Sequence, residues 1–191
     1  MSQPTSDFQT DIASPKSDIT ARRTRLREFQ AQLVERMQTA RSGTDARVNQ
    51  LGVMIGEQRW LLNLQTAGEI VSVGTITPVP LTQPWFLGLT NIRGNLISVI
   101  DFARFQGLPA TNIEKDSRIV AFGPSLAFNS GLLVSRVLGL RNVAEMQLHA
   151  DTAETDAPWA SKRYLDQESQ VWTELDLSSV IQNPQFLHVG L

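Results

Sequence analysis

Apolar positions near the N-terminus repeat with the period of a helix. Four of them between residues 18 and 41 follow one another at spacings of three, four and four: Leu26, Phe29, Leu33 and Met37. This spacing places them on one face of an α-helix. The segment contains neither Gly nor Pro, Asp18 or Ser17 can cap its start, and Gly43 follows its end. We therefore expect an amphipathic helix over 18–41 with a linker to residue 47, packed on the body of the protein or on a partner.

Beyond Asn49 the pattern changes to short runs of β-branched and aliphatic residues, separated by turn residues every 8–12 positions. This spacing is typical of an all-β sandwich or barrel. Ten such runs are present, at 51–55, 59–64, 70–76, 86–92, 96–100, 118–122, 131–134, 138–146, 162–165 and 170–175. Ten short strands are many for a single small barrel.

Two of these runs end alike, which indicates an internal repeat. Asp101 and Asp176 each follow a strand and precede a short helical turn, and they are 75 residues apart. Each carboxylate can accept hydrogen bonds from the free backbone N–H groups at the start of its turn. We therefore expect residues 48–184 to form two packed five-stranded β-barrels, over about 50–110 and 111–183, with the option that the N-terminal segments of the two halves are exchanged. Residues 185–191 are expected to be a C-terminal tail.

Composition narrows the class of protein. Of the 191 residues, 41% are hydrophobic and 19% are charged, as in a soluble globular protein. The sequence contains no run of about 18 uncharged apolar residues, which is the length that a membrane-spanning helix needs. The polar residues 1–17 read as a disordered lead-in and contain no apolar core of a secretory signal. We therefore expect a cytoplasmic protein without a membrane-inserted segment.

Few residues are suited to metals, cofactors or catalysis. The chain has no Cys, and its two histidines, His149 and His188, are 39 positions apart. No glycine-rich phosphate loop, dinucleotide-binding glycine motif or Gly-x-Ser-x-Gly nucleophile context is present. We expect no disulfide, no metal site, no cofactor and no catalytic residues, so the protein is not expected to be an enzyme.

Charge is distributed unevenly along the chain. Residues 16–47 carry eight basic and four acidic side chains, whereas residues 141–176 carry three basic and eight acidic ones. The basic arm indicates either an interaction segment or a solvated helix face. A nucleic-acid-binding barrel remains the alternative function, although residues 49–191 hold nine basic against thirteen acidic residues and show no basic stripe with interleaved aromatics. No nucleic acid is expected as a partner.

The stretch from Pro84 to Phe102 reads as two apolar strands joined at Arg93-Gly94, where Gly94 can take a positive φ. An arginine at such a turn is either solvated or faces a partner. This stretch resembles the signature of the CheW family, coupling proteins of bacterial chemosensory systems. The matching segments span about residues 49–183 and are Leu51–Leu64, Glu69-Ile70, Thr77–Pro80, Gly88, Asn91-Ile92-Arg93-Gly94, Val99–Phe102, Arg118–Val120 and Gly131–Val134.

The resemblance implies two SH3-like barrels, no catalytic activity, and an adaptor that bridges the cytoplasmic tip of a chemoreceptor to the regulatory domain of a histidine kinase. It also implies recruitment to membrane-associated receptor arrays. Four positions are carried over as binding residues: Glu69, Asn91, Arg93 and Gly94. Four others belong to the structural motif: Gly88, Asp101, Gly131 and Asp176. Arg93 and Glu69 are expected to lie near each other on the receptor-facing side.

Two positions depart from the family pattern. Ser135 stands where an Asp is frequent, and Ala67 stands where Val is usual, and both changes bear on receptor contact. The N-terminal extension, with its helix over 18–41, is longer than in short members and resembles the members that serve type IV pilus twitching motility. We therefore expect an adaptor of a twitching-motility system.

Overall fold

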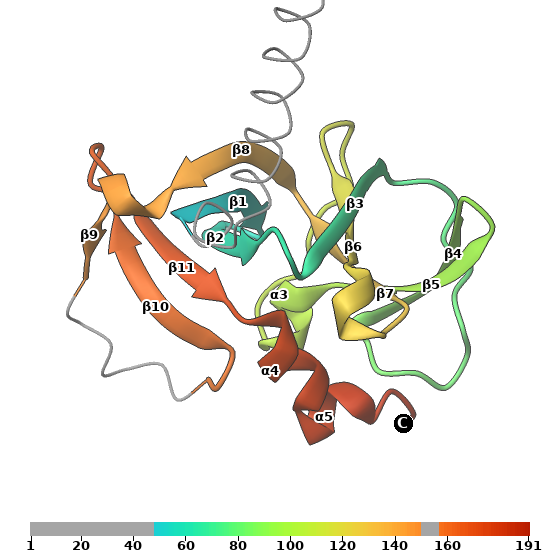
Figure 1. Ribbon diagram of the computed structural model, residues 1–191. Coiled ribbons are helices and arrows are strands. Elements are labelled where there is room, and N and C mark those ends of the chain that lie inside the picture. The colour runs from blue at the N-terminus through green and yellow to red at the C-terminus, as the bar shows by residue number, and fades with distance from the viewer. Residues whose placement is uncertain (1–47, 150–156) are drawn as a thin grey trace, which may run out of the picture. The chain divides into compact units, whose positions relative to one another are not determined.

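The computed structural model describes residues 48–149 and 157–191, which belong to a compact unit beginning at Gly43. The expected lead-in 1–17 and the expected helix over 18–41 lie outside the described residues. Most of the regular secondary structure in the described part is short strands, joined by loops, three short α-helices and two 3-10 turns (Figure 1). The expected all-β fold is confirmed.

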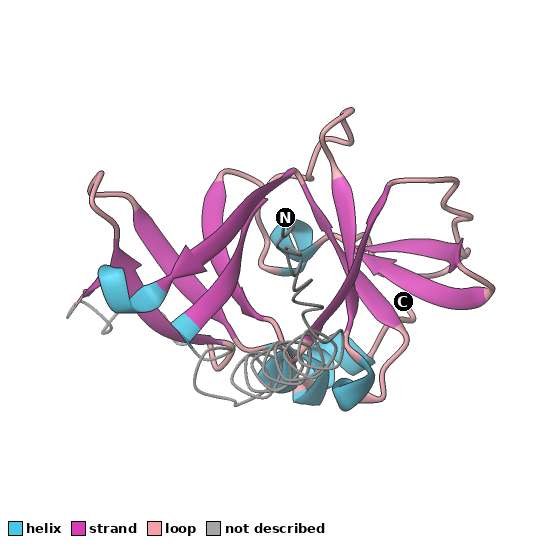
Figure 2. Ribbon diagram, turned by 45° about the horizontal axis from the view of Figure 1, so that its top comes forward, coloured by secondary structure: helices cyan, strands magenta, loops and turns pink. Residues whose placement is uncertain are grey.

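Two sheets make up this fold, and Figure 2 shows them side by side. The six-stranded sheet has the order β8-β1-β2-β11-β10-β9, and the five-stranded sheet has the order β3-β6-β7-β5-β4. The six-stranded sheet contains β1 (Asn49–Ile55), β2 (Gln58–Asn63), β8 (Arg136–Asn142), β9 (Gln147–Leu148), β10 (Ala160–Leu165) and β11 (Val171–Leu175). The five-stranded sheet contains β3 (Ala67–Ser72), β4 (Phe86–Ile92), β5 (Asn95–Ile100), β6 (Arg118–Phe122) and β7 (Ser130–Val134).

The expected run over 138–146 is shorter in the structure, and the eleventh strand, β9, follows it. Strand β8 ends at Asn142, whose side chain accepts a hydrogen bond from the Ala144 N–H and caps the 3-10 turn η2 (Val143–Glu145). The chain then resumes as β9, which pairs with β10. The expected strand over 70–76 also begins earlier, at Ala67, and ends at Ser72. These shifts follow from local capping and pairing that hydrophobic pattern does not record.

Each sheet contains strands from both sides of residue 110, where the sequence predicts the boundary between the two barrels. Hairpin β1–β2 belongs to the six-stranded sheet, where β2 pairs in parallel with β11. Hairpin β6–β7 belongs to the five-stranded sheet, where β7 pairs in parallel with β5. The first hairpin of each half of the chain therefore belongs to the sheet of the other half. There the backbone N–H and C=O groups of β2 and β7 form hydrogen bonds with a neighbouring strand, so these strands are not exposed edges.

The internal repeat extends beyond the two aspartates. The backbone N–H of Asp101 donates to the Trp85 carbonyl, and that of Asp176 donates to the Trp159 carbonyl, both at 2.8 Å. Each Trp precedes a hairpin, β4–β5 in one half and β10–β11 in the other, and each Asp begins a short helix. These helices are α3 (Phe102–Phe105) and α4 (Leu177–Gln182).

The main core joins both sheets. Buried apolar side chains from β1, β2, β5, β6, β7 and β11 form one cluster, and α3, α4 and α5 (Pro184–Leu187) lie at the junction of the sheets (Figure 1). Aromatic rings fill much of this junction: Trp60, Trp85, Phe102, Phe105, Phe128, Trp159 and Phe186. Such edge-to-face and stacked pairs contribute about 0.5–1.5 kcal/mol each beyond burial. The core therefore ties the two sheets together.

The C-terminal residues are part of this core, which differs from the expected tail over 185–191. The Asn183 side chain caps α5, and Pro184 occupies its first turn. Phe186 is buried and stacks on Trp85 with ring centroids 5.6 Å apart. Beyond the helix, Gly190 forms a β-bridge with Thr82. Burial of Phe186 therefore anchors the segment that was expected to be a free tail.

Candidate functional site

Hairpin β4–β5 carries the signature residues of the sequence at its tip. Arg93 and Gly94 form a two-residue turn with φ values of 51° and 90°. Two positive φ values define a type I′ turn, whose twist matches that of the strands it joins. Gly94 adopts this conformation freely, whereas Arg93 does so at a cost of about 1–2 kcal/mol. The Asn91 side chain helps to hold the turn because its Oδ1 accepts a hydrogen bond from the Gly94 N–H at 2.8 Å.

Arg93 is tied to Glu69, as expected from the resemblance. Its Nη2 lies 2.8 Å from Glu69 Oε1, and the two side chains are 80% and 34% exposed. Strands β3 and β4 are the two edges of the five-stranded sheet, so this ion pair connects one edge with the hairpin tip at the other. An exposed pair of this kind contributes only about 0–1 kcal/mol to stability. Its main effect is to hold the guanidinium in one place.

Gly88 and Gly131 are required by packing. A Cβ on Gly88 would lie 2.1 Å from the Thr77 carbonyl oxygen, and its φ is 131°. The register of β4 against β5 shifts at this residue, which lets Leu89 exchange two backbone hydrogen bonds with Thr77. A Cβ on Gly131 would lie 2.7 Å from the Ile119 side chain. The structure therefore gives both glycines a role in strand packing.

Both aspartates cap their helices, and Asp101 does more. The Asp176 carboxylate accepts from the Ser178 N–H at 2.9 Å and from the Ser179 hydroxyl at 2.7 Å. The Asp101 carboxylate accepts from the Arg104 N–H at 3.3 Å, and also from the N–H and hydroxyl of Thr111 at 2.9 Å. Asp101 is 1% exposed. It therefore fastens the segment that leads from the first half to the second.

A second hairpin tip, which the sequence indicates only as a turn, has its own polar cluster. Asp166 at the end of β10–β11 accepts a hydrogen bond from the Trp172 indole at 2.8 Å, and Arg141 of β8 lies over the Trp172 ring. Burial raises the pKa of Asp166, but the hydrogen bonds from Trp172 and from the Gln170 and Glu168 backbone, with the Arg141 charge, outweigh it and lower the pKa. The sequence signal for the contact between Asp166 and Trp172 is their spacing, because the aspartate begins a turn and the tryptophan follows six residues later.

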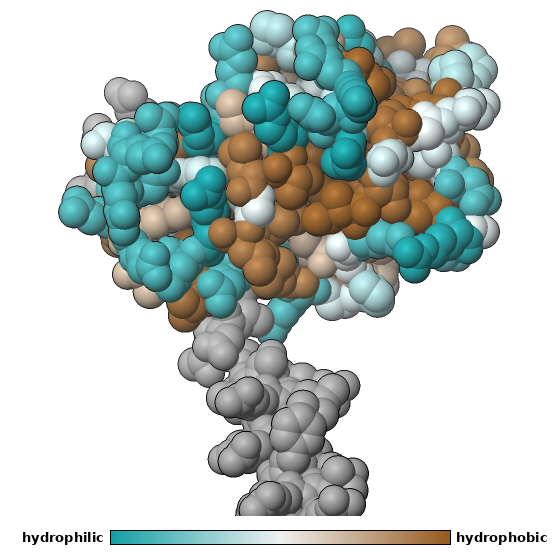
Figure 3. Space-filling view, turned by 90° about the horizontal axis from the view of Figure 1, so that it is seen from above, coloured by the Kyte–Doolittle hydropathy of each residue, from teal (hydrophilic) through white to brown (hydrophobic). Residues whose placement is uncertain are grey.

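Other kinds of site are not seen in the described part. Within residues 48–149 and 157–191, no three His, Cys, Asp or Glu side chains converge as metal ligands. In the same part of the chain, no helix has the length and apolar character needed to cross a membrane. The upper face, where β3 and β8 lie in Figure 1, instead bears a band of apolar side chains bordered by polar ones (Figure 3). Strands β3 and β8 each expose a large apolar side chain, Ile70 and Leu140.

Comparison with known proteins agrees with this fold. The model of the CheW-like domain matches residues 50–185. The chemotaxis protein CheW of Thermotoga maritima is 27% identical over 132 residues, which are 69% of this chain and 86% of that protein. Protein PilI of Pseudomonas aeruginosa is 25% identical over 92 residues, and protein FrzA of Myxococcus xanthus is 28% identical over 89 residues. These alignments cover 48% and 47% of this chain, and 51% and 55% of the two relatives.

Among solved structures, the scaffolding protein TtCheW of Thermoanaerobacter tengcongensis superposes with a TM-score of 0.59 at 20% identity. The match covers 72% of this chain and 94% of that one, and it shows a shared fold. The family model covers both exchanged hairpins, both capping aspartates and the Arg93 turn. The chain therefore belongs to the CheW family, and it is an adaptor of chemotaxis-type signalling, not an enzyme.

Proposed function

We propose that this protein couples the cytoplasmic tip of a chemoreceptor to the regulatory domain of a histidine kinase, in a system that controls type IV pilus twitching motility. Similarity to PilI and the N-terminal extension support the assignment to twitching motility. Binding to the receptor recruits the protein to membrane-associated arrays. No covalent step is needed, because the work of an adaptor is to hold two partners in a fixed relation.

The observation that carries this proposal is the conformation of Arg93. Arg93 adopts an energetically unfavourable left-handed backbone conformation, and its guanidinium is exposed at the end of the hairpin. Glu69 binds one side of the Arg93 guanidinium. The other N–H groups of this planar guanidinium can donate hydrogen bonds to an acidic group of the partner. Glu69, Asn91, Arg93 and Gly94 together form the receptor contact in this proposal.

The apolar band of the upper face supplies the remaining binding energy. Protein interfaces combine a buried apolar centre with a polar rim, and a few residues dominate the affinity. Exposed Ile70 and Leu140 come from two different sheets. A helical receptor tip lying across this face would contact both halves of the adaptor.

The test is a pull-down followed by titration, with the receptor tip and the kinase regulatory domain as separate ligands. We expect Arg93→Ala to weaken receptor binding about tenfold, which corresponds to about 1.4 kcal/mol, and to leave kinase binding unchanged. Lys162→Ala, an exposed cation on β10, serves as the matched control. Equal affinity of wild type and Arg93→Ala for the receptor tip would remove the hairpin from the interface.

A further inference from the structure

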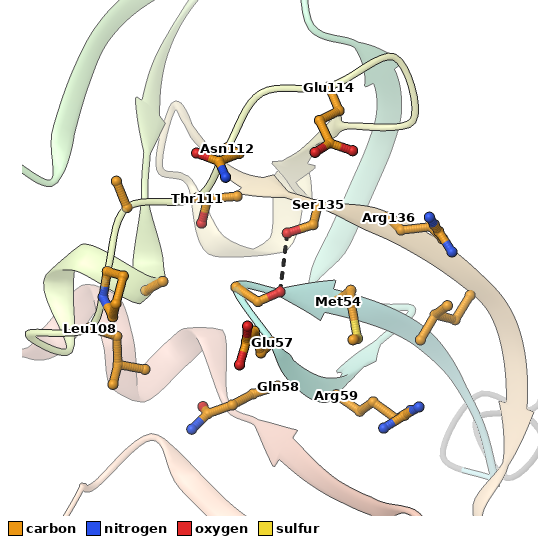
Figure 4. Close-up of a pocket in the computed structure, with 15 residues that line it drawn as sticks. Met54, Glu57, Gln58, Arg59, Leu108, Thr111, Asn112, Glu114, Ser135 and Arg136 are labelled. Atoms are coloured by element: carbon orange, nitrogen blue, oxygen red, sulfur yellow. Dashed lines mark hydrogen bonds between the residues drawn. The ribbon is translucent and has the colours of Figure 1, made fainter.

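A cavity of about 650 Å³ lies away from the Arg93 turn, between three segments that the exchange of hairpins brings together. They are the β1–β2 turn, the beginning of β8 and residues 108–114, which follow α3 (Figure 4). Cavities of about 300–1,000 Å³ are large enough to bind small ligands or the side chains of a partner. Part of its lining is apolar: Met54, Ala103, Leu108 and Leu138.

One flank of the cavity has a regular arrangement of charge. Met54 of β1 lies directly opposite Arg59 of β2 and directly opposite Arg136 of β8. Residues opposite each other on neighbouring antiparallel strands point to the same face, so the three side chains form a row with the methionine in the middle. Two strand spacings separate the arginines, which places their Cα atoms about 10 Å apart. Figure 4 shows Met54 between the two arginines.

Within the described residues 48–149 and 157–191, neither arginine is held in a close ion pair. Among the described residues, Arg59 forms no ion pair, and Arg136 reaches only Asp116, at 3.8 Å with both side chains more than 60% exposed. Glu57 and Glu114 also line the cavity; Figure 4 shows Glu57 beside Gln58, away from the two guanidinium groups, and Glu114 above Ser135. This flank is therefore open to an external anion.

Ser135 fixes the position of this flank. Its hydroxyl donates to the Gly56 carbonyl at 3.3 Å, which ties the start of β8 to the β1–β2 turn. The Ser135 N–H also donates to the Met54 carbonyl at 2.8 Å. An Asp in place of Ser135 would put a negative charge beside Arg136 and reduce the attraction for an anion. Ser135 therefore leaves this flank without a further negative charge beside Arg136.

We propose that this cavity binds an acidic segment of a partner protein, with two carboxylates about 10 Å apart on either side of an apolar side chain. Residues seven apart in a helix meet this spacing, because each residue advances about 1.5 Å. Each guanidinium binds one carboxylate with paired hydrogen bonds. Met54 adapts its flexible side chain to the apolar residue between them. The apolar floor favours a protein segment over a free phosphate, which would leave it empty.

The probe for this proposal is a fluorescein-labelled helical peptide of about 15 residues, with two glutamates seven positions apart around a leucine. Fluorescence anisotropy with the full chain measures its binding. We expect Arg136→Gln and Arg59→Gln each to weaken binding at least fivefold, and Lys162→Gln, which removes one exposed charge outside the cavity, to change it less than twofold. A peptide with glutamine in place of both glutamates should bind at least tenfold more weakly.

Two further measurements separate the cavity from general charge attraction and from the hairpin tip. Ala110→Trp places a large side chain at an exposed position of the cavity lining and should block the peptide without removing a charge. Arg93→Ala should bind the peptide as wild type does, whatever its effect on the receptor. Absence of peptide binding, equal weakening by Lys162→Gln and Arg136→Gln, or displacement of the peptide by inorganic phosphate at similar concentration would each overturn the proposal.

Discussion

Asp101 and Asp176 begin equivalent helices in the two halves with nearly the same backbone angles, φ −87° and −85° and ψ 96° and 99°. Their carboxylates nevertheless have different partners. Among the described residues, the Asp176 carboxylate accepts hydrogen bonds only from its own turn, whereas the Asp101 carboxylate also accepts from Thr111, ten residues away. Thr111 lies in the segment that connects the first half to the second, so the Asp101 cap also holds this connection. The two caps are equivalent in backbone geometry but differ in importance, because Asp101 binds a segment outside its own turn.

The two hairpin tips differ in a similar way. In the first half, a basic turn residue, Arg93, pairs with an acid on edge strand β3. In the second half, an acidic turn residue, Asp166, is stabilised by Arg141 on edge strand β8. The arrangement is the same and the signs are reversed, so the repeated fold presents one basic and one acidic end. A single partner with one charge pattern cannot bind both tips equally well.

The largest expected difference between the halves concerns Gly88. Gly88→Ala should lower the free energy of unfolding by about 3–4 kcal/mol, because the new Cβ meets the Thr77 carbonyl and the positive φ disfavours alanine. Lys162, three residues after Trp159 as Gly88 is after Trp85, should tolerate alanine within about 0.5 kcal/mol. Urea denaturation measures both. Gly94→Ala is the control for φ alone, since nothing lies within 4 Å of its Cβ position.

The next difference concerns the two caps. Asp101→Ala should cost about 2–3 kcal/mol, because Thr111 loses two acceptors in a buried place. Asp176→Ala should cost about 1 kcal/mol, the usual value for a lost N-cap. Denaturation midpoints at constant slope provide the comparison. Equal costs would mean that Thr111 finds other partners and that the two caps are equivalent after all.

A smaller expected effect is that the stability contributed by the Asp166 tip depends on pH. The pKa of Asp166 is lowered below its ordinary value of 3.8, so its charged form is favoured by the folded state. The stability that this provides is present above the unfolded pKa and is lost as the pH falls through the lower folded pKa. The melting temperature of Asp166→Asn should therefore approach that of wild type as the pH is lowered below the ordinary pKa of 3.8. A constant difference over the acid range would contradict this linkage.

The smallest stability effect is expected for the Glu69–Arg93 pair, at about 0–1 kcal/mol. Its coupling in receptor binding should be larger, because the pair orients the guanidinium. A double-mutant cycle with Glu69→Ala and Arg93→Ala on receptor-tip affinity measures that coupling. The exchanged pair Glu69→Arg with Arg93→Glu should recover part of the lost affinity if the two side chains act together. Additive losses would make Arg93 an independent contact.

Local chemistry explains how much the sequence could predict. Gly94 and the two aspartates carry their signals within a few residues, so the hairpin and both caps could be predicted. The Thr111 contact and the Arg141–Asp166 interaction depend on residues brought together from a distance, and no local pattern records them. The same holds for the row of Arg59, Met54 and Arg136, whose members come from three strands. Strand number was nearly predictable, but strand order was not, because hydrophobic alternation says which face is buried and not which neighbour pairs.

The exchange of hairpins also fixes the order of events during synthesis. Strand β2 ends at Asn63 and finds its parallel partner β11 only when the chain has reached Leu175. At about 5–20 residues per second, the ribosome needs on the order of 5–20 s to deliver that partner. During this interval β2 lacks its parallel partner, and pairing over such a separation slows folding further. A nascent chain of this protein therefore has to keep its first hairpin from other edges until nearly its last strand has emerged.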